Sequence, residues 1–173
     1  MGLFDFLFRR NPTADWRETV ASTAVDITGC QVMGKGFRSR TADFAGLGPA
    51  SKWPAKNGCG MLVYPPKGLQ LDFEYDQFVG VTITLLRLPY EQDPAAKTFQ
   101  GRLTRAGTPL QFGAGASEAE IVEAFSSPHA RDEDDEETIL KYEFGNVVLE
   151  FELFKAQGLG VINVFCEGDV KPL

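Results

Sequence analysis

Two segments of this chain match each other without a gap, and this internal match constrains the fold more than any other feature of the sequence. Residues 64–74 align with residues 142–152 at a constant offset of 78. The identical residues form four pairs, namely Tyr64 and Tyr142, Leu71 and Leu149, Phe73 and Phe151, and Glu74 and Glu152. In both segments apolar residues alternate with polar ones, and a period of two is typical of a half-buried β-strand. The match therefore predicts a duplicated unit that contains β-strands.

The residues around each copy predict the same order of elements. In the second copy, Ser117 and Glu120 form the Ser-x-x-Glu pattern of a helix capping box, and Gly145-Asn146 suit the positive φ of a tight hairpin. The elements predicted for the second copy are a strand at 108–112, a helix that follows Ser117 and ends before Pro128, a charged loop at 131–137, and strands at 139–142, 147–153 and 160–166. Those predicted for the first copy are a strand at 25–28, a helix near 41–47, and strands at 61–64, 69–75 and 79–88, with a further helix at 13–24 before them.

These patterns predict an α+β fold of two tandem repeats, each a helix packed on an antiparallel β-meander, that form one compact body. The expected organisation is an N-terminal amphipathic segment at 1–12, a first repeat at 13–88, a linker at 89–101 and a second repeat at 102–173. A unit of about 75 residues is marginally stable when its own core is the only source of stability. We therefore expect the two sheets to join or to pack together.

This twofold order of strand, turn, helix, charged loop and three-stranded meander resembles the beta-lactamase inhibitor protein and the small lipoprotein domains that share its helix-plus-sheet unit. The resemblance covers residues 20–88 and 108–167 and implies a helix packed on each sheet. As a small acidic chain, the protein is also similar to the bacterial proteins that act as immunity partners of toxins, and that similarity implies a protein-binding function. Neither resemblance assigns a binding residue through a shared motif.

The charge of the chain is uneven. The net charge is −7, which divides into +2 for residues 1–90, with ten Lys and Arg against eight Asp and Glu, and −9 for residues 91–173, with seven against sixteen. An acidic half repels a phosphate backbone, so we expect no nucleic-acid partner. The same field attracts a basic protein and accelerates the encounter with it.

The strongest local signal is a run of six carboxylates, which are the predicted partner-binding residues Asp132, Glu133, Asp134, Asp135, Glu136 and Glu137. Mutual repulsion should keep such a run extended in water, and a partner rich in Lys or Arg would relieve the repulsion. The loop at the matching position, 51–58, is basic and carries Trp53, a residue type that anchors interfaces. The alternatives are a solvated loop at 132–137 and a Trp53 that is buried under a helix.

Other groups that could carry chemistry have simpler interpretations. The string Gly29 to Gly36 satisfies Gly-x-x-x-x-Gly-Lys but lacks the hydroxyl that must follow the lysine of a phosphate-binding loop, so we expect a turn. His129 is the single histidine and should lie in an exposed loop. The carboxylates that alternate along the two matched strands, Asp72, Glu74, Glu150 and Glu152, should lie on a solvated face with pKa values near normal.

The cysteines do not fit a metal site or a disulfide framework. Cys30, Cys59 and Cys166 are odd in number and widely spaced, so we expect buried free thiols in a reducing compartment. With one histidine and three scattered cysteines, the chain lacks any familiar zinc-ligand set. The sequence therefore predicts no metal, no cofactor and no enzymatic activity.

Together these observations predict a non-enzymatic cytoplasmic protein that binds another protein. The favoured function is that of an immunity or inhibitor protein, which neutralises a basic toxin domain by occluding its active site with an acidic surface. We expect neither a nucleic-acid partner nor stable insertion into a membrane. Membrane insertion is not expected because no apolar run approaches the ~20 residues of a membrane-spanning helix. The alternative is a structural or adaptor module that self-associates, as a weak homodimer, with an acidic loop that only solubilises it.

Overall fold

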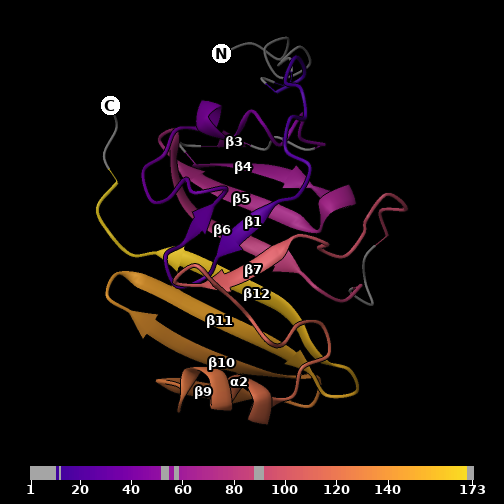
Figure 1. Ribbon diagram of the computed structural model, residues 1–173, viewed down its shortest axis with the longest axis vertical. Helices are drawn as coiled ribbons and strands as arrows, with labels where there is room; N and C mark the ends of the chain where they lie inside the picture. The colour runs from indigo at the N-terminus through magenta and orange to yellow at the C-terminus, as the bar shows by residue number, and fades with distance from the viewer. Residues whose placement is uncertain (1–10, 12, 52–54, 57–58, 88–91, 171–173) are drawn as a thin grey trace.

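The computed structural model describes residues 11, 13–51, 55–56, 59–87 and 92–170. Within them the chain forms two β-sheets, one α-helix and two short 3-10 helices (Figure 1). Across this described part, no helix has both the length and the apolar character needed to cross a membrane.

The larger sheet has eight strands in the order β3-β4-β5-β6-β12-β11-β10-β9, and every neighbouring pair is antiparallel. Its strands from the first half of the chain are β3 (Ala55–Lys56), β4 (Cys59–Tyr64), β5 (Leu69–Glu74) and β6 (Gln77–Thr84). Those from the second half are β9 (Ala130–Glu133), β10 (Glu137–Phe144), β11 (Val147–Phe154) and β12 (Gly158–Cys166). Strands β4–β6 form one meander and β10–β12 another, and the two meanders meet where β6 pairs with β12 (Figure 1).

The smaller sheet has four short strands in the order β2-β1-β7-β8. They are β1 (Ala24–Asp26), β2 (Gln31–Val32), β7 (Arg102–Arg105) and β8 (Thr108–Pro109). Strands β1 and β7 are parallel, and the other two pairs are antiparallel. In Figure 1 this sheet lies in front of β6 and β12, at the middle of the larger sheet. Both sheets therefore combine strands from the two halves of the chain.

The one α-helix in the described residues is α2 (Glu118–Phe125), and its predicted capping box is confirmed. The Glu120 amide donates to Ser117 Oγ at 3.4 Å, and the Ser117 amide donates to Glu120 Oε2 at 2.8 Å. At the other end of the helix, the Phe125 ring lies 5.6 Å from the ring of Tyr142 and 5.3 Å from that of Phe151. These contacts pack α2 against β10 and β11.

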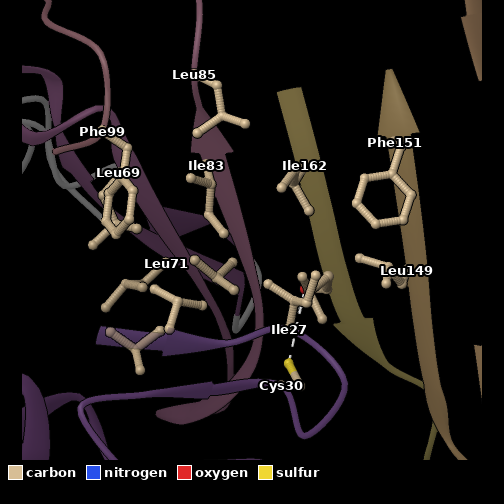
Figure 2. Packing of buried hydrophobic residues seen from close by; sticks show 14 of the residues in the cluster. Ile27, Cys30, Leu69, Leu71, Ile83, Leu85, Phe99, Leu149, Phe151 and Ile162 are labelled. Carbon is tan, nitrogen blue, oxygen red and sulfur yellow. Dashed lines mark hydrogen bonds between the residues drawn. The ribbon is translucent and has the colours of Figure 1, made fainter. Parts of the chain in front are cut away.

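The core lies between the two sheets and under α2. Along β5, Leu69, Leu71 and Phe73 are buried and the residues between them are half-exposed, as the period of two predicts. Figure 2 shows side chains from β5, β6, β12 and β11 that face Ile27 and Cys30 in the turn after β1. Full burial of one such aliphatic side chain contributes about 1.5–3 kcal/mol, so this layer holds the smaller sheet on the larger one.

The two meanders are related by a local twofold arrangement at the centre of the larger sheet. Val81 and Ile83 of β6 match Ile162 and Val164 of β12 in sequence, which places Thr82 opposite Asn163 in the match. In the structure Thr82 pairs directly with Asn163, and the matched neighbours pair crosswise, Val81 with Val164 and Ile83 with Ile162. The point of symmetry therefore lies at the Thr82–Asn163 pair.

Equivalent contacts recur beside each meander at the predicted offset of 78. The Tyr64 hydroxyl donates to the Gly48 carbonyl at 3.4 Å, and the Tyr142 hydroxyl donates to the Ser126 carbonyl at 3.0 Å. In the smaller sheet, Val25 pairs with Leu103, again 78 residues away. The sequence match thus corresponds to equivalent surroundings for the two tyrosines.

The predicted fold class is nevertheless wrong, because the protein is mostly β and does not consist of two helix-on-sheet repeats. Segment 13–24 contains several β-branched residues, which lower helix propensity, and its backbone bonds to distant partners. The Thr19 amide donates to the Gly46 carbonyl at 3.0 Å, and Glu18 forms a β-bridge with Leu47. The helix predicted near 41–47 is only the short 3-10 helix η1 (Thr41–Phe44).

Two further expectations of the sequence are corrected by strand pairing. Part of the predicted charged loop at 131–137 is strand β9. The pairing of the first two strands differs by two residues between the meanders, although the sequence match has no gap. Leu62 pairs with Leu71, whereas Leu140, which matches Leu62 in sequence, pairs with Phe151. The cause is the connection between the strands: it spans 65–68, which includes the 3-10 helix η2 (Pro65–Lys67), in the first meander, but only Gly145-Asn146 in the second.

Candidate protein-binding face

The larger sheet has one face turned away from the core, which we call the outer face. It is formed by the half-exposed residues that alternate with the buried ones, and strand pairing aligns them in rows across the sheet. Its central residues are Asp72 and Thr82 from the first meander and Ile139, Lys141, Glu150, Glu152 and Asn163 from the second. Strand β9 adds Asp132, which pairs with Ile139, so carboxylates extend from the centre of this face to its edge.

A chain of hydrogen bonds crosses the middle of the outer face. Thr82 Oγ1 donates to Asn163 Oδ1 at 2.8 Å, and Asn163 Nδ2 donates to Glu152 Oε1 at 2.5 Å. The three side chains come from β6, β12 and β11. This chain holds the Glu152 carboxylate at the point where the two meanders meet.

Burial raises the pKa values of two carboxyls on this face. Desolvation raises the pKa of Glu152, and the nearby charges of Glu137 and Glu150 raise it further, against the hydrogen bond from Asn163. Desolvation also raises the pKa of Asp72, although Gln70 Nε2 donates to Asp72 Oδ1 at 2.9 Å. The expectation of a fully solvated face with pKa values near normal is therefore wrong for these two residues.

A hollow of about 200 Å³ lies on the same face, beside the Thr82 side chain. Its wall includes Val63, Gln70, Thr82 and Thr84 from the sheet and, from the flanking segments, Arg87 and Lys97. The two cations give the first-meander side of the outer face a polarity opposite to that of the carboxylates over β9–β11. A partner of mixed charge would thus meet this face in a defined orientation.

The run 132–137 is an ordered hairpin, which we call the acidic hairpin, and not the extended loop that its charge predicts. Asp132 and Glu133 end β9, and Glu137 begins β10. Within the turn, Asp134 Oδ1 accepts hydrogen bonds from the Glu136 amide at 2.8 Å and the Glu137 amide at 2.9 Å, and these bonds lower the pKa of Asp134. Local side-chain-to-backbone bonds therefore outweigh the repulsion along the run.

Glu133 is neutralised by cations of the protein itself. It forms an ion pair with Lys155 and a second one with Arg131, with 2.5 Å between Arg131 Nη1 and Glu133 Oε2. These contacts lower the pKa of Glu133 to about 2. Arg131 also pairs with Glu118 at the start of α2, at 2.9 Å. Of the six predicted binding carboxylates, Glu133 is thus paired within the protein, with Lys155 in the turn after β11 and with Arg131, which also reaches α2.

Trp53, the other predicted partner-binding residue, lies outside the described residues. His129 is exposed, as predicted, and its Nδ1 accepts from the Glu143 amide at 3.3 Å. No group of three or more His, Cys, Asp or Glu in the described residues is arranged to hold a metal ion.

The sequence did not single out Thr82 and Asn163, which organise the outer face. Neither residue belongs to a motif, and both are ordinary polar positions in alternating strands. The signal that could have found them is the internal match itself, because it places them at equivalent positions. Their direct pairing, however, depends on β6 and β12 being neighbours in the sheet. The order of strands in a sheet is a property of the tertiary structure and cannot be seen in the sequence match.

Comparison with known proteins adds a distant structural similarity. No family model and no curated protein matches the sequence. The fold is similar to the crystal structure of a DUF4309 family protein, YjgB, from Bacillus subtilis, with a TM-score of 0.45 and 12% sequence identity over 75% of this chain and 79% of that chain. The expected resemblance to the beta-lactamase inhibitor protein and the small lipoprotein domains is wrong, since the described residues form one α-helix and two sheets and lack a helix packed on each sheet.

Proposed function

We propose that this chain is a non-enzymatic cytoplasmic inhibitor or immunity protein, which covers the basic active site of a toxin domain with its outer face and acidic hairpin. The toxin would act inside the cell on a polyanion, since a cationic active site serves a negatively charged substrate. The carboxylates of this protein would occupy the place of the substrate's phosphates.

The observation that carries the proposal is the position of Glu152. A half-buried carboxylate with a raised pKa costs folding stability at neutral pH, and a neutral residue could make the same hydrogen bond with Asn163. Such costs concentrate at functional sites, where the charge is needed for something other than folding. A cation from a partner would compensate the desolvated charge that the fold leaves on this face.

The alternative function, a self-associating adaptor, is less well supported than inhibition, because the edge strand β9 is poorly suited to pair with a second copy. Self-association through an edge strand needs an open row of backbone groups without charge repulsion between the copies. Strand β9 carries Arg131, Asp132 and Glu133 in succession, all exposed, and the acidic turn follows directly. Charged residues on an edge strand oppose pairing with a second copy.

The test uses the basic toxin domain encoded nearest to this chain in its native genome. Its affinity for the full chain is measured by titration calorimetry at about 50 and 300 mM salt, together with inhibition of its activity. The variant Asp132→Asn/Glu150→Gln/Glu152→Gln keeps the shape of the outer face but removes three charges. We expect it to bind at least about tenfold more weakly and with a smaller salt dependence.

The matched control removes the same number of charges from other exposed positions, as Glu123→Gln/Glu167→Gln/Asp169→Asn. We expect this control to stay within about threefold of the unaltered affinity. Equal losses in the two variants would mean that only net charge matters. That result, or a toxin domain that stays fully active in the presence of the chain, would refute the proposed function.

A further inference from the structure

The hollow of about 200 Å³ on the outer face brings apolar side chains and positive charge together. Both of its cations, Arg87 and Lys97, are exposed. No Asp or Glu is among the described residues that line it. The apolar residues of its wall are Val63, Pro65, Leu69 and Ala96. The hollow therefore offers a ligand an apolar surface beside two positive charges.

The fold does not use these two cations to neutralise its own carboxylates. None of the ion pairs that the described residues form with one another involves Arg87 or Lys97. Other cations of the chain, such as Lys67 and Arg131, do pair with carboxylates. The positive charge at the hollow is therefore available to an anion from outside the chain.

Lys97 is held at the hollow by backbone bonds on both sides of it. The Lys97 amide donates to the Pro65 carbonyl at 2.8 Å, and the Phe99 amide donates to the Thr84 carbonyl at 2.8 Å. Gly68 permits this close approach, because a Cβ atom there would lie 2.5 Å from the Phe99 nitrogen. The backbone position of Lys97 is thus fixed before a ligand arrives, which reduces the entropy that binding would cost.

Arg87 is placed by the end of β6. The amides of the two residues before it, Leu85 and Leu86, both donate to the Gly160 carbonyl of β12, at 2.7 and 3.1 Å. The chain therefore leaves the sheet at a defined point, and Arg87 follows directly. Both cations are carried by backbone that is bonded to the larger sheet.

The sheet itself supplies the rest of the wall, and the size of the hollow limits what it can hold. Val63 of β4 pairs with Gln70 of β5, and Gln70 pairs with Thr82 of β6, so the three residues form one row. Drug-sized ligands occupy pockets of about 300–1,000 Å³. At about 200 Å³, the hollow suits a single small ring or a short chain.

We propose that the hollow is a binding site for a small organic carboxylate. The carboxylate group would be bound by Arg87 and Lys97, and the apolar body of the ligand would lie on the wall that β4–β6 form. The two cations select an anion, and a guanidinium matches the two oxygens of a carboxylate. The apolar wall favours an organic anion over an inorganic one, because burial of apolar surface adds to the binding free energy. This site does not depend on the proposed toxin partner.

The first experiment titrates the unaltered full chain with benzoate, with its neutral analogue benzamide and with its cationic analogue benzamidine. Amide shifts in NMR spectra at low salt follow the binding. We expect benzoate to give saturable shifts at Gly68, Gln70 and Lys97, with a Kd at least about tenfold lower than that of either analogue. Inorganic phosphate, which has no apolar body, should bind at least about threefold more weakly than benzoate.

Each of the other outcomes would overturn the proposal. Benzoate that does not saturate these shifts at about 20 mM would show that the hollow is not a site. Benzamidine that binds as tightly as benzoate would show that the two cations do not select the ligand. Phosphate that binds as tightly as benzoate would show that the apolar wall contributes nothing.

The second experiment tests the two cations with a matched pair of variants. Arg87→Gln/Lys97→Gln should weaken benzoate binding at least about fivefold. The control Lys35→Gln/Arg102→Gln also removes one exposed lysine and one exposed arginine, and it should bind within about twofold of the unaltered chain. Equal losses in the two variants would overturn the proposal, because only net charge would then matter. All four substitutions are at exposed positions, so we expect an unchanged Tm.

Discussion

At the scale of single residues, Glu152 shows how a charge on the outer face affects stability. A carboxyl whose pKa is higher in the folded chain stabilises the fold fully at pH values below its unfolded pKa and loses that contribution as the pH rises through the folded value. At pH 7 the charged Glu152 therefore lowers stability. We expect Glu152→Gln to raise the Tm by a few degrees at pH 7, because glutamine keeps an oxygen that can accept from Asn163.

The pH dependence of that gain is the decisive measurement. The gain in Tm should shrink as the pH is lowered towards the ordinary pKa of 4.5, where Glu152 itself is neutral. Glu74→Gln removes the same charge at the end of β5 and is the control. A Glu152→Gln variant that is less stable than the unaltered chain at pH 7 would show that the charge contributes to folding.

The opposite sign holds for Glu133. Its ion pairs with Lys155 and Arg131 lower its pKa to about 2, so the stability that it contributes is present above its ordinary pKa of 4.5 and is lost as the pH falls towards 2. We expect Glu133→Gln to reduce the Tm at pH 7 and to make no difference near pH 2. Thermal unfolding followed by circular dichroism at several pH values checks this, with Glu123→Gln on the exposed side of α2 as the control. A loss of Tm that was the same at every pH would contradict the assignment.

At the scale of elements, the cap of α2 is the local feature with the clearest energetic consequence. Ser117→Ala removes the side chain that accepts from the Glu120 amide, and loss of such a cap costs about 1 kcal/mol. Urea unfolding should show this loss with an unchanged m-value. Ser117→Asp, which can cap in the same way, should restore most of the stability. Failure of aspartate to do so would mean that the helix start depends on other contacts.

The far end of the same helix is held by packing. Phe125 is 5% exposed and contacts the rings of Tyr142 and Phe151, so Phe125→Ala should cost about 3–5 kcal/mol. Phe125→Leu keeps most of the apolar volume and should cost less. Chemical unfolding of the two variants measures the difference. Equal costs would show that ring contacts, and not volume, hold α2 on the sheet.

Elements that depend on neighbouring residues could be predicted from the sequence, and those that depend on distant residues could not. The capping box of α2 and the Gly145-Asn146 hairpin are local signals, and both are confirmed. The segment 13–24 has a plausible helical pattern in isolation, but the Thr19 amide donates to the Gly46 carbonyl and the Thr13 hydroxyl accepts from the Ala50 amide, and no local pattern reveals these bonds. The ordered structure of the acidic hairpin is not predictable from its own residues for the same reason, since cross-strand pairing of β9 with β10 organises it.

At the scale of the whole molecule, the two halves of the chain share both sheets. The β6–β12 pair joins the meanders, and the β1–β7 pair joins the halves again in the smaller sheet. We therefore expect the full chain to unfold in one transition and the separate fragments 1–91 and 92–173 to remain unfolded. Dispersion of amide signals in NMR spectra of each fragment tests this. A fragment that folded alone would show that the shared pairs are not essential.

The candidate site could be predicted only in part, because a surface is a property of the assembled sheet. The carboxylates of 132–137 and the acidic alternation of β5 and β11 are visible in the sequence. Which of them are desolvated, and which are neutralised by the protein itself, follows from burial and pairing. Glu133 was expected to bind a partner, yet it is neutralised by Lys155 and Arg131.

The direct pairing of Thr82 with Asn163 has a consequence for how chains of this kind can diverge. Because the two residues occupy matched positions and touch each other, neither half of the molecule can change at this point independently of the other. Across homologous sequences, replacements at the two positions should occur together, as pairs that preserve one donor and one acceptor. The centre of the sheet would then be the slowest part of the outer face to evolve, while its two edges are free to acquire different partners.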